Sequence, residues 1–523
     1  MADISNFDIE APSNVISVGD MKKLTSRLAT AWGSQSSKYE EWWSWISGEK
    51  LRETDGVKAK DGKSKLIAKY PLEINPALWI AQKHGEILWG EVPDDAGNMV
   101  NFSYRAEDRT QPAELEVIAD IVNRVWFDSH PRDVLSQAGF LSQFLGGAVL
   151  GISRSDSTKY GLRISNVIPD FFLPVFDSTD PWNLLESWRC FYITPEEAAE
   201  NYGVKISADK DKCVLSEQWT RDYYEILVDG KPPTRMFGLE GYKSAGENPI
   251  GRVPYVYIPH YLRTADHYGM SQIPGIAKLM LELNSRTADA GDYVRENSGT
   301  EYVLKNTTVA PKALILPNGK QAIDIGKPQV GSNLDPDLSR MQTSSVNGDI
   351  HQKLPRQIME MIQRDGATPN ITWGEDEGSQ RSAITLAFKM WPLTSHIRKE
   401  RAMWAEGFRQ LNDIIVRWLG VLKTNNLPEN AADYLSFTKW EPMTPRDRLD
   451  LVNEVVTLYS VHLLSQKRAV QLLNRGEDVA EELAEIKKDM EEAQKSLGNS
   501  QGSPAGAIIS NGAANSISQQ ANQ

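Results

Sequence analysis

Residues 269–297 read GMSQIPGIAKLMLELNSRTADAGDYVREN, and this stretch has the pattern of one long helix. Ser271 suits the cap position and Pro274 the first turn, where no backbone hydrogen bond is lost. The first half carries apolar residues at helical spacing on one side, namely Ile276, Leu279, Met280 and Leu283. The second half is nearly devoid of apolar residues, so a core of the same chain does not surround it. About 24 residues give roughly 36 Å of helix, which projects beyond an ordinary domain.

A small β insertion and a second long helix follow this stretch. Three short apolar runs, at 302–305, 313–316 and 322–325, surround a Pro317-Asn318-Gly319 turn and predict strands. The next helix carries an aligned face of Val346, Ile350, Leu354, Ile358 and Met361. Pro355 inside it predicts a kink. Two long helices therefore flank a compact β element.

The chain before residue 269 divides into a helical part and a β-rich part. Helical spacing predicts that the first 150 residues are helices, with a polar loop at 50–65 and helices opened by Asn75-Pro76 and by Pro131. From 148 to about 261 the period shifts toward two, which indicates strands, and Asp229-Gly230 suits a tight hairpin turn. The fold class is predicted to be α+β.

The chain after residue 365 is predicted to be helical around one polar loop. That loop, 366–380, holds the acid cluster Glu375-Asp376-Glu377. A very long helix at about 382–422 bends at Pro392 and buries one face, formed by Ile397, Arg401, Trp404, Phe408, Leu411, Ile415 and Trp418. Two shorter helices and an acid-rich helix follow. Beyond Gly498 the composition of Ser, Asn, Gln, Gly and Ala predicts disorder.

Composition excludes several classes of protein. The longest apolar stretch, 140–152, is too short to cross a membrane, and the acidic N-terminal residues do not have the pattern of a signal peptide. Cys190 and Cys213 are expected to be buried free thiols. The formal net charge of −13 argues against a DNA-binding regulator, because nonspecific adhesion to DNA needs an excess of Lys and Arg. A negative wall does suit a protein that lets DNA pass without gripping it.

No catalytic, metal or cofactor site is expected. Gly62-Lys63-Ser64 departs from the phosphate-loop spacing, and no serine-hydrolase elbow occurs. The acid cluster at 375–377 lacks the ligand spacing of a calcium loop, so we interpret it as a solvated charge run. We interpret the histidines as structural or surface residues, since none forms a His-x-x-x-His pair; they are His84, His130, His260, His267, His351, His396 and His462.

Four passages, taken in this order, resemble the portal protein of tailed bacteriophages. They are NPALWIAQKHGEILWGEV at 75–92, GMSQ at 269–272 with the helix after it, EGSQRSAITLAFKM at 377–390, and LLSQKRAVQLLNRGEDVAEELAEIKKDMEE at 463–492. In that family they correspond to a wing helix, the opening of the first stem helix, the tunnel loop with the kinked helix, and the crown. The resemblance covers about residues 75–492.

The resemblance implies a mainly α portal fold with long stem helices, a β-rich wing region and a small β clip insertion. Its parts would be the wing at 1–268, stem helix 1 at 269–297, the clip at 298–340, stem helix 2 at 341–365, the tunnel loop at 366–380, the kinked helix and the rest of the wing at 381–444, the crown at 445–495 and a disordered tail at 496–523.

The resemblance also implies a function without catalysis. The chain would be one subunit of a homo-oligomeric ring, conventionally of twelve, at one capsid vertex of the virion, made in the host cytoplasm. Double-stranded DNA would pass through it nonspecifically during packaging and ejection. Its protein partners would be the terminase large subunit, the major capsid and scaffolding proteins, and head-tail adaptor proteins. No cofactor is implied, since ATP hydrolysis belongs to the terminase.

Two sets of site residues follow from the resemblance. The expected contacts with DNA in the channel are Asn370, Thr372, Trp373, Glu375, Asp376 and Glu377. The expected docking residues of the clip are Tyr302, Lys305, Lys312 and Lys320.

Two other functions remain open from the residues alone. One is a large cytosolic enzyme with a helical accessory region, which a monomer or dimer in solution would favour. The other is a different structural ring component of a virion, such as an adaptor, although those chains are usually much shorter.

Overall fold

A computed structural model of the 523-residue chain shows two compact units. The first comprises residues 1–90 and 97–443, and the second residues 91–96 and 444–523. The structure describes residues 26–52, 73–90, 100–106, 114–155, 157–207, 210–235, 243–262, 267–297, 302–305, 312–315, 321–324, 337–340, 345–373, 383–424, 427–440, 443, 448–473, 483–484 and 486–488.

The predicted N-terminal helices are present. They are α2 (Ser26–Ile46), the short α3 (Glu49–Arg52), α4 (Pro76–Trp89), α5 (Glu114–Asp128) and α6 (Pro131–Leu145). Proline occupies the first position of α4 and α6, as expected where the amide has no helical partner. Gly146 ends α6 in the left-handed conformation, with φ of 72°. Most of the predicted polar loop at 50–65 lies outside the described residues.

The prediction that the first 150 residues contain only helices is wrong at one place. Residues Asn101–Arg105 form strand β1, which pairs antiparallel with β14 (Leu435–Lys439). Phe102 and Tyr104 are buried on one face of β1, whereas Asn101, Ser103 and Arg105 are partly or fully exposed. Because the partner strand lies far along the chain, pairing and packing decide this strand rather than local preference.

Two antiparallel sheets make up the predicted β-rich region. The three-stranded sheet has the order β3-β2-β9, with β2 (Gly147–Arg154) between β3 (Leu162–Val167) and β9 (Tyr255–Pro259). Helix α6 contacts β2 and β3, and the long helix α10 contacts β2 and β9. The first six residues of β2 are consequently buried, and the strand has the continuous apolar sequence of a covered strand.

The second sheet is a five-stranded meander in sequence order. Its strands are β4 (Phe172–Phe176), which follows a 3₁₀ turn η3 (Pro169–Phe171), β5 (Leu184–Ile193), β6 (Cys213–Thr220), β7 (Tyr223–Val228) and β8 (Ala245–Glu247). Helix α7 (Pro195–Tyr202), which the sequence reading did not anticipate, lies between β5 and β6 in the chain and begins with a capping box of Thr194 and Glu197.

Two local predictions in this region are confirmed. Asp229 and Gly230 adopt φ of 52° and 77°, and Val228 and Lys231 exchange backbone hydrogen bonds of 2.9 Å across them, as a tight turn requires. Cys190 and Cys213 are buried free thiols. Burial raises the pKa of Cys190 to about 12, so this thiol is not reactive.

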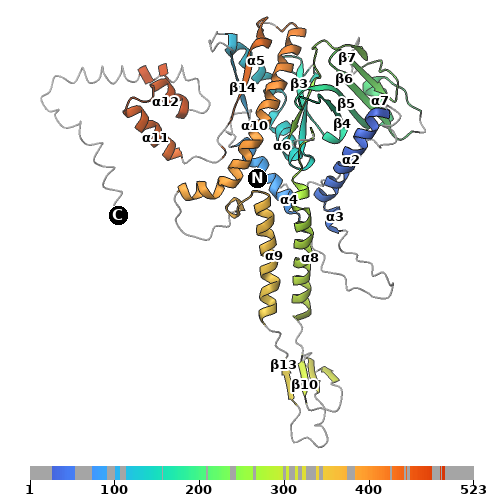
Figure 1. The fold of residues 1–523 in the computed structure, drawn as a ribbon, viewed down its shortest axis with the longest axis vertical. Helices are drawn as coiled ribbons and strands as arrows, with labels where there is room; N and C mark the ends of the chain where they lie inside the picture. The colour runs from blue at the N-terminus through green and yellow to red at the C-terminus, as the bar shows by residue number, and fades with distance from the viewer. Residues whose placement is uncertain are drawn as a thin grey trace, which may run out of the picture. The chain divides into compact units, whose positions relative to one another are not determined.

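The two long helices are present and lie side by side (Figure 1). They are α8 (Ile273–Asn297) and α9 (Ser345–Asp365), and α9 runs as one helix through Pro355. Ile276, Met280 and Leu283 of α8 are buried in a core cluster that also contains Ile358 and Ile362 of α9. Met361, which the sequence placed on the same face as Ile358, is instead 50% exposed, because the buried position one turn after Ile358 is residue 362.

The predicted β insertion between α8 and α9 contains four strands. β10 (Tyr302–Lys305) pairs antiparallel with β13 (Asp337–Arg340), and β11 (Lys312–Ile315) pairs with β12 (Gln321–Asp324). The three predicted strands are thus confirmed to within one residue, and β13 was missed. Asp337–Arg340 reads DLSR, which has too few apolar residues to mark a strand by itself.

Helix α10 (Ala383–Val421) is the central helix of the first unit. The predicted inward face is confirmed, since all seven of its residues are buried. Around it gather the rings of Trp89, Phe102, Trp126 and Trp440, with Trp89 and Trp404 at 4.9 Å between centroids. The helix contains Pro392 and bends along its length (Figure 1). A short 3₁₀ turn, η5 (Ala431–Asp433), precedes β14.

The described part of the second unit consists chiefly of two helices, α11 (Arg448–Ser460) and α12 (Gln466–Leu473), both of which the sequence predicted. Most of the predicted acid-rich helix and all of the predicted disordered tail lie outside the described residues. No helix within the described ranges is both long and apolar enough to cross a membrane.

Candidate functional site

The turn that ends α9 leads directly into the predicted tunnel loop. The amide of Gly366 donates to the Ile362 carbonyl at 2.8 Å, and the amide of Thr368 donates to the Gln363 carbonyl at 2.8 Å. Ala367 adopts φ of 52°, which reverses the chain at the helix end. Thr368 is fully buried. The first residues of the loop are therefore fixed to the helix.

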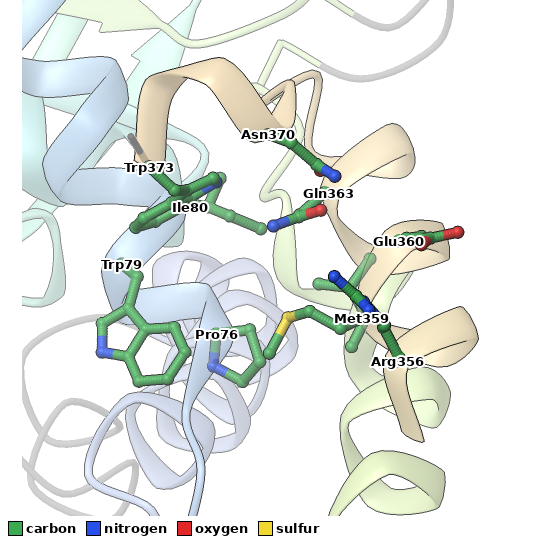
Figure 2. A pocket seen from close by; sticks show the side chains of 10 residues that line it. Pro76, Trp79, Ile80, Arg356, Met359, Glu360, Gln363, Asn370 and Trp373 are labelled. Carbon is green, nitrogen blue, oxygen red and sulfur yellow. The ribbon is translucent and has the colours of Figure 1, made fainter. Parts of the chain in front are cut away.

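A 3₁₀ turn, η4 (Asn370–Trp373), follows and closes a cavity of about 280 Å³. Figure 2 shows this cavity, with Trp79 and Ile80 of α4 on one side and Arg356, Met359 and Gln363 of α9 on the other. Trp373 is the last residue of η4, and its ring is edge-on to Trp79 of α4 at 6.3 Å between centroids. The cavity is thus lined by α4, α9 and η4.

The structure describes three of the six predicted channel residues. Asn370 is exposed and lines the cavity rim, whereas Trp373 is half-buried against Trp79. Thr372 donates from Oγ1 to the Pro369 carbonyl at 2.7 Å, which stabilises the 3₁₀ turn. Glu375, Asp376 and Glu377 lie outside the described residues. Trp373 accordingly anchors the start of the loop on α4, a role that the sequence did not suggest.

Three of the four predicted clip residues lie on described strands. Tyr302 and Lys305 are the end residues of β10 and pair with Arg340 and Asp337 of β13. Lys312 begins β11 opposite Asp324 of β12, so it belongs to a different pair of strands. Lys320 lies outside the described residues.

A buried cluster of three histidines and one glutamate lies behind the turn at Gly366. Oε1 of Glu400 faces His396 Nε2 at 3.0 Å, His84 Nδ1 at 3.6 Å and His260 Nδ1 at 3.6 Å. The side chains of Glu400, His84 and His260 are fully buried, and that of His396 is 21% exposed. The cluster joins α4, the segment after β9, and α10.

Two glutamines and a carbonyl complete the surroundings of the cluster. Gln143 donates from Nε2 to the second carboxylate oxygen of Glu400 at 3.0 Å. Gln272 donates from Nε2 to Gln143 Oε1 at 2.6 Å and lies 3.2 Å from His84 Nδ1. His84 donates from Nε2 to the Gly366 carbonyl at 2.8 Å. The cluster therefore contacts the residue before α8 and the residue after α9.

The electrostatics of the cluster are unusual. Burial lowers the pKa of His260 to about 4, so its imidazole is neutral at neutral pH. Burial also acts to raise the pKa of Glu400, but the surrounding imidazoles outweigh burial and hold it below its ordinary value. Glu400 is thus an ionised carboxylate that is itself fully buried.

This cluster was not predicted from the sequence, because no His-x-x-x-His pair occurs in the chain. The pattern that does mark the cluster is His396 and Glu400, four residues apart on one helix. That spacing puts both side chains on the same face of α10. The other members come from distant parts of the chain, so only the fold brings them together.

One comparison with known proteins gives a match. A family model described as phage portal protein, SPP1 Gp6-like, matches residues 96–496. No curated protein matches the chain significantly.

Proposed function

We propose, from the premise that this chain belongs to the SPP1 Gp6-like family of phage portal proteins, that it forms a ring through which the phage genome is packaged and ejected. The family is structural, and its members belong to the virion. Family membership favours this function over the alternative of a cytosolic enzyme.

The observation that carries the ring proposal is the exposure of large apolar side chains on the long helices. Val294 of α8 is 63% exposed, Met361 of α9 is 50% exposed, and Phe388 and Trp391 of α10 are 75% and 56% exposed. Fully burying a large apolar side chain stabilises a protein by about 1.5–3 kcal/mol relative to leaving that side chain in water. In a cyclic ring each subunit covers a different face of its neighbour, so one contact repeats around the ring and buries these residues.

The parts of the portal are proposed at the boundaries that the resemblance implies. Helices α8 and α9 would form the stem, the four strands between them the clip, α10 the kinked helix, and α11 and α12 part of the crown. The side-by-side packing of α8 and α9 supports the stem assignment. The start of the second unit at Thr444 is close to the proposed start of the crown at 445.

The channel is proposed to act passively. Glu375, Asp376 and Glu377 would face the DNA and repel phosphate, which keeps the duplex from sticking while it moves. Trp373 and its contact with Trp79 would hold the start of this loop on α4. Asn370, which is exposed, would provide a neutral contact near the loop base.

Partner docking is proposed at the clip. Tyr302, Lys305, Lys312 and Lys320 would contact the terminase large subunit during packaging and adaptor proteins afterwards. Residues 298–340 carry five Lys and Arg against four Asp and Glu, so the clip is less acidic than the chain as a whole, whose net charge is −13, and can meet an acidic partner surface. Charged contacts of this kind would weaken as salt is raised.

Electron microscopy of the purified full chain tests the ring. A ring with a central hole is expected, and the same particles should form in the triple variant Glu375→Gln, Asp376→Asn, Glu377→Gln. A solitary compact particle at all concentrations would overturn the ring proposal.

DNA packaging by the same triple variant tests the channel. We expect packaging or retention of DNA to fall, because the loop loses its repulsion of phosphate. A matched control replaces three exposed acids elsewhere, Glu196, Glu200 and Glu247, by Gln and should package normally. Equal packaging by the triple variant and the control would contradict the proposal that these acids act in the channel.

A further inference from the structure

The buried cluster around Glu400 has the donor atoms of a metal site. His84, His396 and Glu400 each offer one ligand atom, and the three atoms lie within 4.8 Å of one another. The donors are imidazole nitrogen and carboxylate oxygen, which suit zinc and neighbouring transition metals, whereas calcium and magnesium prefer oxygen donors alone.

The spacing of these atoms fits one tetrahedral ion. Ligands at about 2.0–2.1 Å from a tetrahedral zinc ion lie roughly 3.3 Å from each other. The distances from Glu400 Oε1 to its three imidazole nitrogens, 3.0, 3.6 and 3.6 Å, bracket that value. The ligand atoms of His84, His396 and Glu400 lie within 4.8 Å of one another, so side-chain shifts would bring them to ligand distance.

Two of the facing atoms have no hydrogen bond. Glu400 Oε1 and His260 Nδ1 are buried polar atoms without a hydrogen-bond partner, although they lie 3.6 Å apart. A buried polar atom left unsatisfied costs about 1–3 kcal/mol, and more when it is charged. A cation beside Glu400 Oε1 would satisfy that oxygen.

The ring nitrogens around Glu400 leave room for a cation partner. Within the described chain, the basic groups within ion-pair distance of Glu400 are the three imidazoles, and no Lys or Arg reaches it.

The groups behind the ligands orient them as in known metal sites. His84 donates from Nε2 to the Gly366 carbonyl, which fixes its tautomer and leaves the Nδ1 lone pair directed at Glu400. Gln143 holds the second oxygen of Glu400 at 3.0 Å. His396, being 21% exposed, lies on a path from solvent.

We propose that His84, His396 and Glu400 bind one zinc ion, with the buried His260 beside the site. The ion would hold α4 to α10, next to the residues from which α8 begins and at which α9 ends. Its role would be structural, since the side chains of His84 and Glu400 are fully buried. On binding, Gln272 would keep its hydrogen bond to Gln143 and release His84 Nδ1. This proposal does not depend on ring formation.

Metal analysis of the purified full chain tests the proposal. After loading with Zn²⁺ and dialysis, we expect about one zinc ion per chain, and X-ray absorption of that sample should show nitrogen and oxygen ligands with imidazole scattering. Chelation should lower the thermal midpoint of unfolding. A sulfur shell, which would point to Cys190 or Cys213, or failure to retain zinc would overturn the proposal.

Variants locate the ion. The double variant His84→Gln, His396→Gln should lose the bound zinc and the stabilisation by zinc, while His462→Asn, which replaces an exposed histidine in the second unit, should retain both. Asn suits this control because position 462 has φ of 60°. Unchanged zinc content in a folded double variant would also overturn the proposal. If the double variant does not fold, the absorption spectrum of the unaltered protein decides.

Discussion

Gly366 and Ile80 approach so closely that a Cβ atom at position 366 would lie 2.6 Å from Ile80 Cδ1. Ile80 is 1% exposed, and the same Cβ would lie 3.2 Å from the Ile362 carbonyl oxygen, so neither neighbour is free to move. Only glycine allows the turn after α9 to pack on α4 at this distance. The base of the proposed tunnel loop is therefore fixed by contact between the Gly366 backbone and the Ile80 side chain.

The first prediction concerns that contact. Gly366→Ala should lower the free energy of unfolding by about 1–3 kcal/mol through overpacking. Gly85→Ala on α4 is the matched control, because a Cβ there meets nothing within 4 Å. This control should raise the free energy of unfolding by about 0.5–1 kcal/mol, since Gly85 lies inside a helix. Urea unfolding of both variants measures the difference, and equal stability of the two would refute the prediction.

The second prediction concerns a buried hydrogen bond between α5 and α10. Trp126 donates from Nε1 to Asn412 Oδ1 at 2.9 Å, and both side chains are fully buried. Asn412→Ala should cost about 1–3 kcal/mol, because the indole N–H loses its acceptor. A double-mutant cycle with Trp126→Phe, measured by urea unfolding, should give a coupling energy of about 1 kcal/mol. Additive effects of the two substitutions would contradict a direct bond.

The third prediction concerns pH. Asp170 accepts a hydrogen bond from Trp43 Nε1, and burial raises its pKa to about 7. Between about pH 4 and 7 the folded chain holds a proton on Asp170 that the unfolded chain releases. The contribution of Asp170 to the free energy of unfolding should therefore fall as pH rises through this window and level off above it.

Replacing Asp170 by a neutral residue tests whether stability falls as pH rises. Asp170→Asn keeps an acceptor for Trp43 and should be more stable than the unaltered chain at pH 8, by an amount on the order of a few kcal/mol. Asp177→Asn is the control: hydrogen bonds from Thr179 lower the pKa of Asp177, so the pH dependence of its effect should be confined to pH below about 4, and the effect should be constant between pH 4 and 8. Urea unfolding at a series of pH values measures both. A larger gain in the free energy of unfolding from Asp170→Asn at pH 4 than at pH 8 would contradict the raised pKa of Asp170.

The fourth prediction concerns the anchor of the tunnel loop. Trp373→Ala should remove an edge-on ring contact worth about 0.5–1.5 kcal/mol and loosen η4. Hydrogen exchange at residues 370–373 should become faster, and limited proteolysis should cut the loop at 374–382 more readily. Phe388→Ala, at a side chain that is 75% exposed, is the control and should leave exchange at η4 unchanged in the monomer. Unaltered exchange in Trp373→Ala would show that the ring contact does not hold the turn.

Much of the fold follows from local sequence. Helices α4 and α6 begin at prolines, α10 shows its buried positions as apolar spacing, and the hairpin turn at Asp229-Gly230 has the residues that its backbone angles require. On α9 the apolar spacing includes Met361, which is exposed. Strands β1 and β13 were not predicted, because long-range pairing rather than local sequence decides them. Each is short, and its pairing with β14 or β10 supplies the hydrogen bonds that its own residues do not signal.

The sequence by itself determined most helices and strands and the two long helices around a β insertion, because apolar period, capping residues and turn residues act over a few neighbours. The family came from the resemblance of four passages to known portal proteins. Only the tertiary structure decided that Trp373 packs on α4 and that His84, His260, His396 and Glu400 converge. Those contacts join residues far apart in the chain, and their energy depends on burial and distance, which no local pattern contains.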